Sequence, residues 1–309
     1  MDRVCAIVVT YNAIKWIERC LQSLESSSIQ VDYVIVDNDS KDETVDFIER
    51  NFSPIKVFRS SRNLGFGKAN NVGLKWAYAA GYDYFFLVNQ DVYVDPEAAG
   101  DLVRLLSNQH VFGVLSPLHL EGSGKELDYL FSNYIKRDKE LSEDLASRKF
   151  GKKTYPVSFV NAACWMISKD TLRKVGIFHP LFFHYGEDDN YVQRLHSEGL
   201  QIGVVPEVSI RHDRNQEKES NLKSSHQTRL QRKILLMLLS PGYHLSFAAS
   251  YRDTIKLTKG HFQFVKKKFM PWHYLLLTKL FIVFYVRIRT SSRADLLSVE
   301  SRKTSELID

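Results

Sequence analysis

Residues 87–92 read Leu-Val-Asn-Gln-Asp-Val, and this stretch joins the end of a strand to a set of polar side chains. It closes an apolar and aromatic run, Tyr84–Val88, which predicts a buried strand. Asn89 and Asp91 follow at the carboxyl end of that strand, and Asp95-Pro96 beyond them indicates the start of a helix. Open α/β sheets bind their ligands at this edge. The two side chains therefore suit either a hard cation such as Mg²⁺ or Mn²⁺, or a turn cap.

Before this stretch, short apolar segments alternate with amphipathic ones. Strands are predicted at Val4–Val9, Tyr33–Val36 and Ile55–Phe58. Helices are predicted at Ile14–Ser26, from the capping-box pattern Ser40-Lys41-Asp42-Glu43 to Asn51, and at Leu74–Ala80, which follows a polar loop over Arg62–Gly73. Repeated β-α units indicate an α/β fold with a doubly wound, mainly parallel sheet.

After Asp91 the pattern is less regular. A helix at Glu97–Ser107 and a strand at Phe112–Leu115 lead into Leu118–Tyr155, which has no clear period and predicts a long loop or lid with some helix. Regular structure is predicted again by Val157–Ile167, by the helical pattern of Glu187–Glu198 and by two short strands, Ile202–Val205 and Val208–Ile210. The β signal stops near residue 216, and a C-terminal helical extension is expected from there.

The charge divides the chain at the same place. Residues 1–215 hold 25 Lys/Arg against 29 Asp/Glu, whereas residues 216–309 hold 17 against 7. An acidic first part does not suit a nucleic-acid binder, while a basic tail rich in aromatic residues suits an anionic membrane surface. We therefore expect one domain over 1–215 and a helical tail over 216–309. With Lys266–Lys268 among its aromatic residues, the tail is either an interfacial membrane anchor, a helical pair packed on the first domain, or a dimer interface.

Three features bear on the cellular compartment. The three cysteines are an odd number with no metal-like spacing, which favours a reducing environment. The apolar run Val4–Val9 is too short for a signal peptide. Tyr274–Ile288 is shorter than the roughly 18 to 20 residues of a membrane span, and Lys279 and Arg287 interrupt it. We expect a cytoplasmic protein, with peripheral contact to the inner face of the cell membrane as an option for the tail.

Two common nucleotide-binding motifs are missing from the places where they would act. Gly65-Phe66-Gly67 comes too late for a dinucleotide-binding turn and has Asn70 where the third glycine would stand. Gly122-Ser123-Gly124-Lys125 lacks both the upstream glycine and the following Ser or Thr of a P-loop. These two forms of phosphate binding are therefore not expected.

Acidic residues recur instead at successive strand ends. They are Asp37 and Asp39 after the second strand, Asp91 after the fourth, and Glu187, Asp188 and Asp189 after an aromatic stretch, with His212 after the last short strand. Any one of them alone is more simply a cap or a solvated turn. Together at one sheet edge they would repel one another unless a cation or a donor-bearing group lay among them.

At this point the chain resembles the family-2 glycosyltransferases of the GT-A fold, in particular their rhamnosyltransferase-like branch. The resemblance covers about residues 4 to 212. Each motif is weak alone, and their order along the chain makes the signal specific. The matching stretches are Val8-Val9-Thr10-Tyr11-Asn12, Val36-Asp37-Asn38-Asp39-Ser40, Asn63–Gly73, Asn89-Gln90-Asp91, Val160–Trp165 and Phe183–Asp189.

The resemblance implies roles for several residues around a nucleotide-sugar. Thr10, Tyr11 and Asn12 would line the base and ribose pocket, and Asp39 would accept a hydrogen bond from a uracil or thymine ring N–H, with Asp37 beside it. The remaining residues implied in nucleotide-sugar binding are Asn63, Gly65, Lys68, Asn71, Asn89 and Gln90, and Arg62 is an alternative to Lys68 near the phosphates.

The resemblance also implies a divalent cation, Mg²⁺ or Mn²⁺, and a carboxylate base. Asp91 would hold the cation, and His212 would ligate it, touch the diphosphate, or serve only as a loop histidine. Asp188 would be the general base, with Glu187 and Asp189 as rivals for that role. Such a cation stabilises the charge that develops on a leaving diphosphate, and a base on the opposite face of the sugar takes the proton of the attacking hydroxyl.

Two positions depart from the family pattern. Asn89 stands where the metal motif commonly opens with Asp, although the rhamnosyltransferase-like branch often has Asn there. Asn190 stands where a further acid often follows the base, and Asp189 could compensate for it.

The sequence thus favours an inverting glycosyltransferase that moves a sugar from a UDP- or dTDP-sugar, with dTDP-rhamnose one candidate, to a glycan or lipid-linked glycan acceptor. The alternatives are a metal-dependent nucleotidyltransferase and a glycan- or nucleotide-binding module without catalysis. The intact acids Asp91 and Asp188 argue against the last of these.

Overall fold

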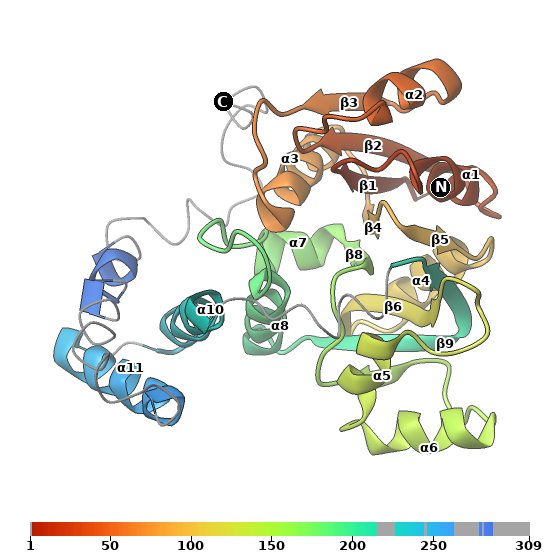
Figure 1. The fold of residues 1–309 in the computed structure, drawn as a ribbon. Helices are drawn as coiled ribbons and strands as arrows, with labels where there is room; N and C mark the ends of the chain where they lie inside the picture. The colour runs from red at the N-terminus through yellow and green to blue at the C-terminus, as the bar shows by residue number, and fades with distance from the viewer. Residues whose placement is uncertain (1, 215–225, 244–245, 263–277, 280, 287–309) are drawn as a thin grey trace.

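The protein is described here by a computed structural model that covers residues 2–214, 226–243, 246–262, 278–279 and 281–286 (Figure 1). Within this part of the chain nine strands form one sheet, in the order β3-β2-β1-β4-β8-β6-β9-β5, with β7 paired to β9. The strands are β1 Val4–Thr10, β2 Val31–Asp37, β3 Lys56–Arg59, β4 Tyr84–Asn89, β5 Val92–Val94, β6 Phe112–Glu121, β7 Tyr155–Val157, β8 Cys164–Ser168 and β9 Gln201–His212.

Helices cover both faces of the sheet, and two more follow it in the chain. They are α1 Ile17–Glu25, α2 Thr44–Asn51, α3 Phe66–Ala79, α4 Ala98–Asn108, α5 Tyr129–Ile135, α6 Lys139–Ser147, α7 Lys169–Val175, α8 Glu187–Ser197, α10 His226–Leu238 and α11 Phe247–Phe262. The predicted α/β class is confirmed.

The first half of the sheet is parallel throughout. Strands β3, β2, β1 and β4 are neighbours, with Val8 of β1 paired to Ile35 of β2 and to Val88 of β4. The same register places Thr10 opposite Asp37. The carboxyl ends of these strands therefore meet at one edge, as expected for a site in an open α/β sheet.

The second half of the sheet is mixed. Strand β8 is antiparallel to both β4 and β6, and β9 is parallel to β6, so six of the nine described strands run in one direction. The predicted strands Ile202–Val205 and Val208–Ile210 are parts of the single strand β9. The register of its pairing with β6 shifts after Val205, so that Leu118 pairs with Ser209. This irregularity, which leaves 206–208 of β9 without partners in β6, breaks the apolar pattern without ending the strand.

Several predicted boundaries were wrong, two of them by several residues. Helix α2 begins at Thr44 rather than at Ser40, because the Ser40 hydroxyl donates to Asp37 instead of capping a helix. Helix α3 begins at Phe66, inside the predicted loop, and its buried Asn71 bonds to the backbone of Phe178.

The segment Leu118–Tyr155, predicted as a long loop or lid with some helix, holds more regular structure than a loop. Strand β6 extends into it as far as Glu121, which was not predicted, whereas the helices α5 and α6 agree with the expected helix. Both helices are short, and α5 takes its N-cap from Asp128, whose carboxylate accepts the Phe131 N–H.

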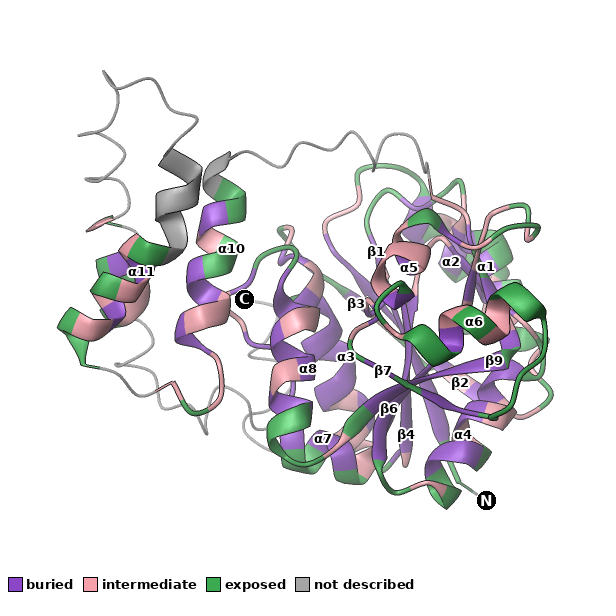
Figure 2. Cartoon of the chain, turned by 90° about the horizontal axis from the view of Figure 1, so that it is seen from below, coloured by how far each residue is buried: buried purple, intermediate pink, exposed green. Residues whose placement is uncertain are grey.

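The two faces of the sheet carry separate apolar cores, and buried residues gather along the strands (Figure 2). Successive residues of β1 alternate between them, as strand geometry requires: Cys5 and Ile7 face one core, and Val4, Ala6 and Val8 face the other. The first core packs against α3, α7 and α8, and the second against α1, α2 and α4. The sheet is therefore doubly wound.

The C-terminal helices are described in part. Helix α10 lies beside α8 in both views (Figures 1 and 2), and its Leu235, together with Leu239 directly after it, packs on Phe182. Among the described residues no helix combines the length and the apolar character needed to cross a bilayer. The predicted Lys266–Lys268 patch, and about half of the apolar run Tyr274–Ile288, lie outside the described residues.

The packing of α3 on β1 depends on a close approach at Gly73. A Cβ atom there would lie 2.5 Å from Cγ2 of the buried Ile7. We expect Gly73→Ala to lower the free energy of unfolding by about 1–3 kcal/mol, because a β-branched core side chain cannot swing away. Urea denaturation measures this.

The matched control is Gly100→Ala in α4, where the nearest side-chain atoms would lie at 3.4 Å. That change should be neutral or stabilising by up to roughly 1 kcal/mol, since alanine favours a helix over glycine. Equal losses in the two variants would contradict the proposed close packing.

Candidate functional site

A pocket of about 400 Å³ opens at the carboxyl edge of the parallel strands. It is lined by Val9, Tyr11, Asn38, Asn63, Gly65, Phe66, Asn89, Gln90, Asp91, Phe183 and His184. Five predicted donor-binding residues are among them: Tyr11, Asn63, Gly65, Asn89 and Gln90. The predicted metal ligand Asp91 also lines this pocket, which we call the donor pocket.

Asp37 and Thr10 lie behind the donor pocket and do not line it. Thr10 is fully buried, and its hydroxyl donates to Asp37 Oδ1 over 2.9 Å. The Asp37 carboxylate also accepts the Ser40 N–H at 3.0 Å and the Ser40 hydroxyl at 2.5 Å. With both oxygens engaged, Asp37 holds the turn after β2 in place.

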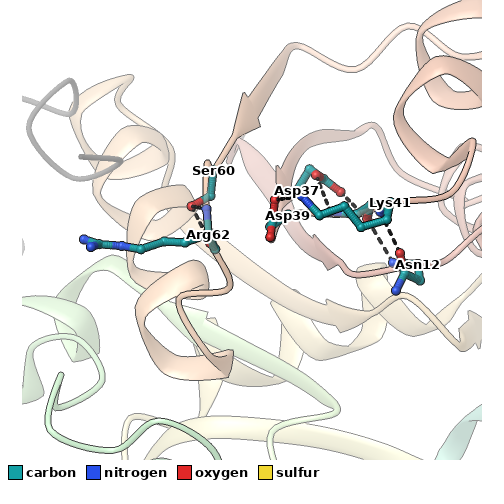
Figure 3. Close-up of polar contacts among 7 residues, drawn as sticks. Asn12, Asp37, Asp39, Lys41, Ser60 and Arg62 are labelled. Carbon is teal, nitrogen blue, oxygen red and sulfur yellow. Dashed lines mark hydrogen bonds and ion pairs between the residues drawn. The ribbon is translucent and has the colours of Figure 1, made fainter.

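Asp39 stands on that turn and Asn12 on the neighbouring turn after β1, and both have left-handed backbone conformations, with φ of 71° and 50°. Asn12 Oδ1 accepts the Lys41 N–H, and the Asp39 carboxylate is paired to Lys41 Nζ at 2.5 Å (Figure 3). The Asp39 side chain is a quarter exposed, so it can change partners when a ligand arrives.

Three other residues predicted for nucleotide-sugar binding do not line the donor pocket. Lys68 is exposed on α3, and Arg62 extends away from Asp37 and Asp39 (Figure 3). Asn71 is buried, with its amide bonded to the Phe178 backbone carbonyl at 2.8 Å and to the Phe178 N–H at 2.9 Å. Asn71 therefore joins α3 to the segment before α8.

Two amide side chains shape the floor of the donor pocket. The Gln90 side chain accepts the Tyr11 N–H at 2.7 Å and donates to the Tyr11 carbonyl at 3.3 Å, so it bridges the ends of β1 and β4. Asn38 donates to Asn63 Oδ1 at 3.0 Å and accepts the Leu64 N–H at 2.6 Å. Asn38 was not predicted as a site residue, although it stands inside a motif that pointed to the site.

Asp91 and His212, the two residues predicted as metal ligands, lie side by side. His212 Nε2 lies 3.4 Å from Asp91 Oδ1, and the pairing of β5 with β9 sets His212 opposite Val92. Burial acts to raise the pKa of Asp91, but the charge of His212 and its hydrogen bond outweigh burial and hold the pKa of that carboxyl below its usual range. The carboxylate is therefore charged at neutral pH.

This pair has the chemistry of a partial cation site. One carboxylate and one imidazole suit Mn²⁺, and Mg²⁺ is commonly held by one or two carboxylates together with substrate phosphates. Over the described part of the chain no three His, Cys, Asp or Glu side chains gather closely enough to hold a metal by themselves. A cation here would need further ligands from a bound molecule.

The three adjacent acids lie at the N-terminus of α8. Asp188 and Asp189 line a second pocket of about 310 Å³, which we call the acid pocket. Gly186 precedes them with φ of 101°, a conformation that glycine adopts without strain. The other residues lining the acid pocket are Asn133, Tyr134, Arg137, Ser158, Phe159, Tyr185 and Arg232.

The acids differ in their environments. Glu187 is 3% exposed, and burial together with the neighbouring Asp188 charge raises its pKa to about 8. Burial, followed by the Asp189 charge, raises the pKa of Asp188 to about 6. Glu187 is therefore mostly protonated at neutral pH, whereas Asp188 is mostly ionised. An ionised carboxylate that lines a pocket is the better base.

Sequence reasoning missed the residues that complete the acid pocket. Tyr134 and Arg137 belong to the segment predicted as an irregular loop, and Arg232 belongs to α10 in the predicted tail. Phe183 was part of a recognised motif, and its carbonyl oxygen accepts the Phe66 N–H at 3.2 Å. Tertiary contacts of this kind leave no periodic signal.

The sheet with its acid-lined pockets has the architecture of the GT-A glycosyltransferases. Solved structures of TarS from S. aureus share it: the complex with UDP-GlcNAc has a TM-score of 0.59 at 20% identity, over 96% of this chain and 84% of that one. The structure of GalNAc-T7 with UDP, GalNAc and Mn²⁺ has a TM-score of 0.57 at 14% identity, over 77% of this chain and 48% of that one.

The family follows from the sequence match. The model described as "Glycosyl transferase family 2" matches residues 5–176, more than half of the chain, so the protein belongs to glycosyl transferase family 2 and is a glycosyltransferase. It is similar to the N-acetylglucosaminyl-diphospho-decaprenol L-rhamnosyltransferase of Mycobacterium tuberculosis, with 23% identity over 68% of this chain and 76% of that one. It is also similar to the dTDP-rhamnosyl transferase RfbF of Shigella flexneri, with 23% identity over 68% of this chain and 69% of that one.

The hydrogen bonds of Asp37 and Asp39 predict different consequences for the same substitution. Asp37→Asn should lower the free energy of unfolding by about 1–3 kcal/mol, because one carboxylate oxygen that accepts a hydrogen bond becomes a donor. Asp39→Asn loses only a surface ion pair and should cost less than about 0.5 kcal/mol, and asparagine tolerates its left-handed backbone. Urea denaturation of both variants compares them. A loss for Asp37→Asn no larger than that for Asp39→Asn would show that Asp37 does not hold the turn.

Proposed function

We propose that this glycosyltransferase moves a sugar from a UDP- or dTDP-sugar to a hydroxyl group of a growing surface glycan, with inversion at the anomeric carbon. One observation carries the proposal: the segment 183–189 lines both pockets. Phe183 and His184 face the donor pocket, while Tyr185, Asp188 and Asp189 face the acid pocket. A donor and an acceptor bound in these pockets would meet at this segment.

The donor end is assigned from the first pocket. Tyr11 is 46% exposed at its rim and offers a ring for stacking on a base. Asp39 lies beyond the lining residues, and we assign it the acceptor role toward a uracil or thymine ring N–H, after release from Lys41. Complexes of TarS with UDP and with UDP-GlcNAc support a nucleotide-sugar as the ligand class. The name of the Shigella relative makes dTDP-rhamnose one candidate donor.

The leaving diphosphate is assigned to Asp91 and His212. A Mg²⁺ or Mn²⁺ ion, when bound by these two residues, would supply Lewis-acid stabilisation of the charge on the leaving group. The Asp91 carboxylate is already ionised, and the imidazole beside it orients it toward the pocket. GT-A enzymes generally use such ions, and the GalNAc-T7 structure contains Mn²⁺.

The proton transfer is assigned to Asp188. The acceptor hydroxyl attacks the anomeric carbon from the face opposite the leaving diphosphate, and its proton passes to the Asp188 carboxylate. The C–O bond to the acceptor forms as the C–O bond to the diphosphate breaks. A single displacement inverts the anomeric centre, so no enzyme nucleophile is needed.

The acceptor and the location are proposed from the relatives. The Mycobacterium tuberculosis relative is named for an acceptor carrying a diphospho-decaprenol group, which makes a lipid-linked glycan a fitting acceptor class. We propose peripheral contact with the inner face of the cell membrane on the same ground, with the basic tail of residues 216–309 as the segment that makes it.

A product assay separates the proposed reaction from the two alternatives. A glycosyltransferase releases UDP or dTDP from a nucleotide-sugar, whereas a nucleotidyltransferase releases diphosphate from a nucleoside triphosphate. Turnover of any nucleotide-sugar would exclude a purely binding module. Diphosphate release from UTP or dTTP, without turnover of nucleotide-sugars, would overturn the proposed function.

For the metal site we expect Asp91→Ala to weaken UDP or dTDP binding mainly when Mg²⁺ or Mn²⁺ is present. Calorimetric titration of the parent should show tighter binding with the ion. The variant should lose about tenfold or more of that gain, which corresponds to about 1.4 kcal/mol. Asp101→Ala, which removes a surface acid of α4 paired to Arg104, is the control and should bind as the parent does. An unchanged metal dependence in Asp91→Ala would show that Asp91 is not the ligand.

For the base we expect Asp188→Asn to lower transfer by a factor of about 10² to 10⁴, with donor affinity nearly unchanged. Because the pKa of Asp188 is raised to about 6, the parent rate should fall as the pH drops below that value and level off above it. Asp189→Asn and Glu187→Gln should each cost less. Near-parent turnover by Asp188→Asn, with one of the other two variants inactive, would move the base to that residue.

A further inference from the structure

Helix α10, far along the chain from the parallel sheet, reaches the acid pocket. Arg232 of this helix lines the pocket together with Asp188 and Asp189. Its Nη2 atom lies 3.5 Å from Asp189 Oδ2, and both side chains are partly exposed, at 44% and 31%. Tyr134 of α5 also lines this pocket, so elements from two other parts of the chain meet the acids there.

The position of α10 is fixed by contacts on both sides of the acids. Before them, the Arg232 stem rests on Gly186, where an added Cβ would lie 2.9 Å from Arg232 Cγ. After them, the side-chain amide of Asn190 donates to the Leu239 carbonyl at 3.4 Å. Leu235 and Leu239 also pack on the buried Phe182. The helix is therefore seated on the segment that carries the three acids.

The acids need a positive partner because three carboxyl groups stand in succession and are largely enclosed. Burial disfavours their charged forms, and each charge disfavours the next. The charged and titratable groups that line the pocket are Tyr134 and Arg137 from the α5 segment, Tyr185 before α8, the acids themselves, and Arg232 from α10; His184 and Glu187 lie next to it in the chain. Among the basic residues that the structure describes, Arg232 is the one shown to form an ion pair with an acid of this cluster.

We propose that α10 is part of the catalytic centre and that Arg232 is a positioning residue, which holds the Asp188–Asp189 pair charged and oriented toward the acceptor. Asp189 receives the guanidinium, and its own N–H donates to Asp188 Oδ1 at 2.9 Å, so the two carboxylates are held as a unit. This inference rests on the proposed function, in which Asp188 takes the acceptor proton.

The electrostatics support this role. The Arg232 charge acts to lower the pKa values of both Asp188 and Asp189 against the larger effect of burial. A half-exposed pair of this kind adds little to stability. In the proposed role, the ion pair instead keeps the base ionised near neutral pH, where proton abstraction is needed.

The test compares Arg232→Gln with Arg229→Gln. Arg229 is exposed one turn earlier on α10, so the control removes the same charge from the same helix. The first readout is the titration of the Asp188 and Asp189 carboxyl carbons by ¹³C NMR in the full chain. We expect both pKa values to rise by about one unit in Arg232→Gln, the usual effect of losing a neighbouring opposite charge. Arg229→Gln should shift them far less.

The second readout is the pH profile of donor turnover, with UDP-GlcNAc and dTDP-rhamnose as probes. In Arg232→Gln the pH of half-maximal turnover on the acidic side of the profile should rise by about one unit, as the carboxyl pKa values do. Turnover near pH 6 should therefore fall severalfold, while the affinity for UDP with Mn²⁺ stays within about twofold. Arg232→Lys should restore most of the profile, since it keeps the charge.

A further variant keeps the test decisive if Arg232→Gln does not fold. Leu239→Ala weakens the packing of the α10 region on Phe182 without changing any charge. It should raise the pKa values of Asp188 and Asp189 by a smaller amount than Arg232→Gln does. Unchanged titrations in Arg232→Gln, or an equal shift in Arg229→Gln, would overturn the role of Arg232. Absence of nucleotide-sugar turnover in the parent would instead overturn the proposed function, and the NMR titration would still decide whether Arg232 controls the acids.

Discussion

The register of the parallel strands is the constraint on which the site depends. Backbone hydrogen bonds set Thr10 beside Asp37 and Val9 beside Asn89, so polar residues far apart in the chain arrive at one edge. A slip of one residue in any of these strands would turn its side chains to the other face. The two apolar cores oppose such a slip, because alternate residues of each strand are already committed to one core or the other. The stability of the fold and the geometry of the site thus have one origin.

A second constraint joins the donor pocket to the acids. Gly65, with φ of 80°, brings the loop before α3 against the segment before α8, and a Cβ there would lie 2.0 Å from the Phe183 carbonyl oxygen. The Phe66 N–H bonds to that same oxygen, and Asn71 repeats the connection one turn further along α3. The glycine is needed for this approach, because no other residue has room for its side chain. The acid-bearing segment is therefore held in place from the donor side.

The sequence was sufficient for the features that repeat along the chain. Apolar runs located β1, β2 and β4 within a residue or two, and the polar residues after them pointed to the correct edge of the sheet. Three kinds of feature escaped it. The antiparallel course of β8 follows from pairing with β4 and β6, which no local pattern encodes. The burial of Thr10 and Asp37 is set by their hydrogen bonds to each other and to Ser40. Arg232 forms an ion pair with Asp189, although composition had assigned the segment that contains Arg232 to a separate tail.

The acid cluster shows how a catalytic requirement can oppose stability. The folded-state pKa values of Glu187 and Asp188 lie above their ordinary values, so the folded protein binds more protons than the unfolded chain between the two sets of values. The contribution of these groups to stability is therefore greatest at low pH and is lost as the pH rises, through about 6 for Asp188 and about 8 for Glu187. In the proposed role Asp188 must be ionised to take a proton, and so it would act in the range where its burial destabilises the fold. A partial countercharge from a neighbouring helix offsets this conflict without removing it, because a complete ion pair would leave the carboxylate too weak a base to take a proton.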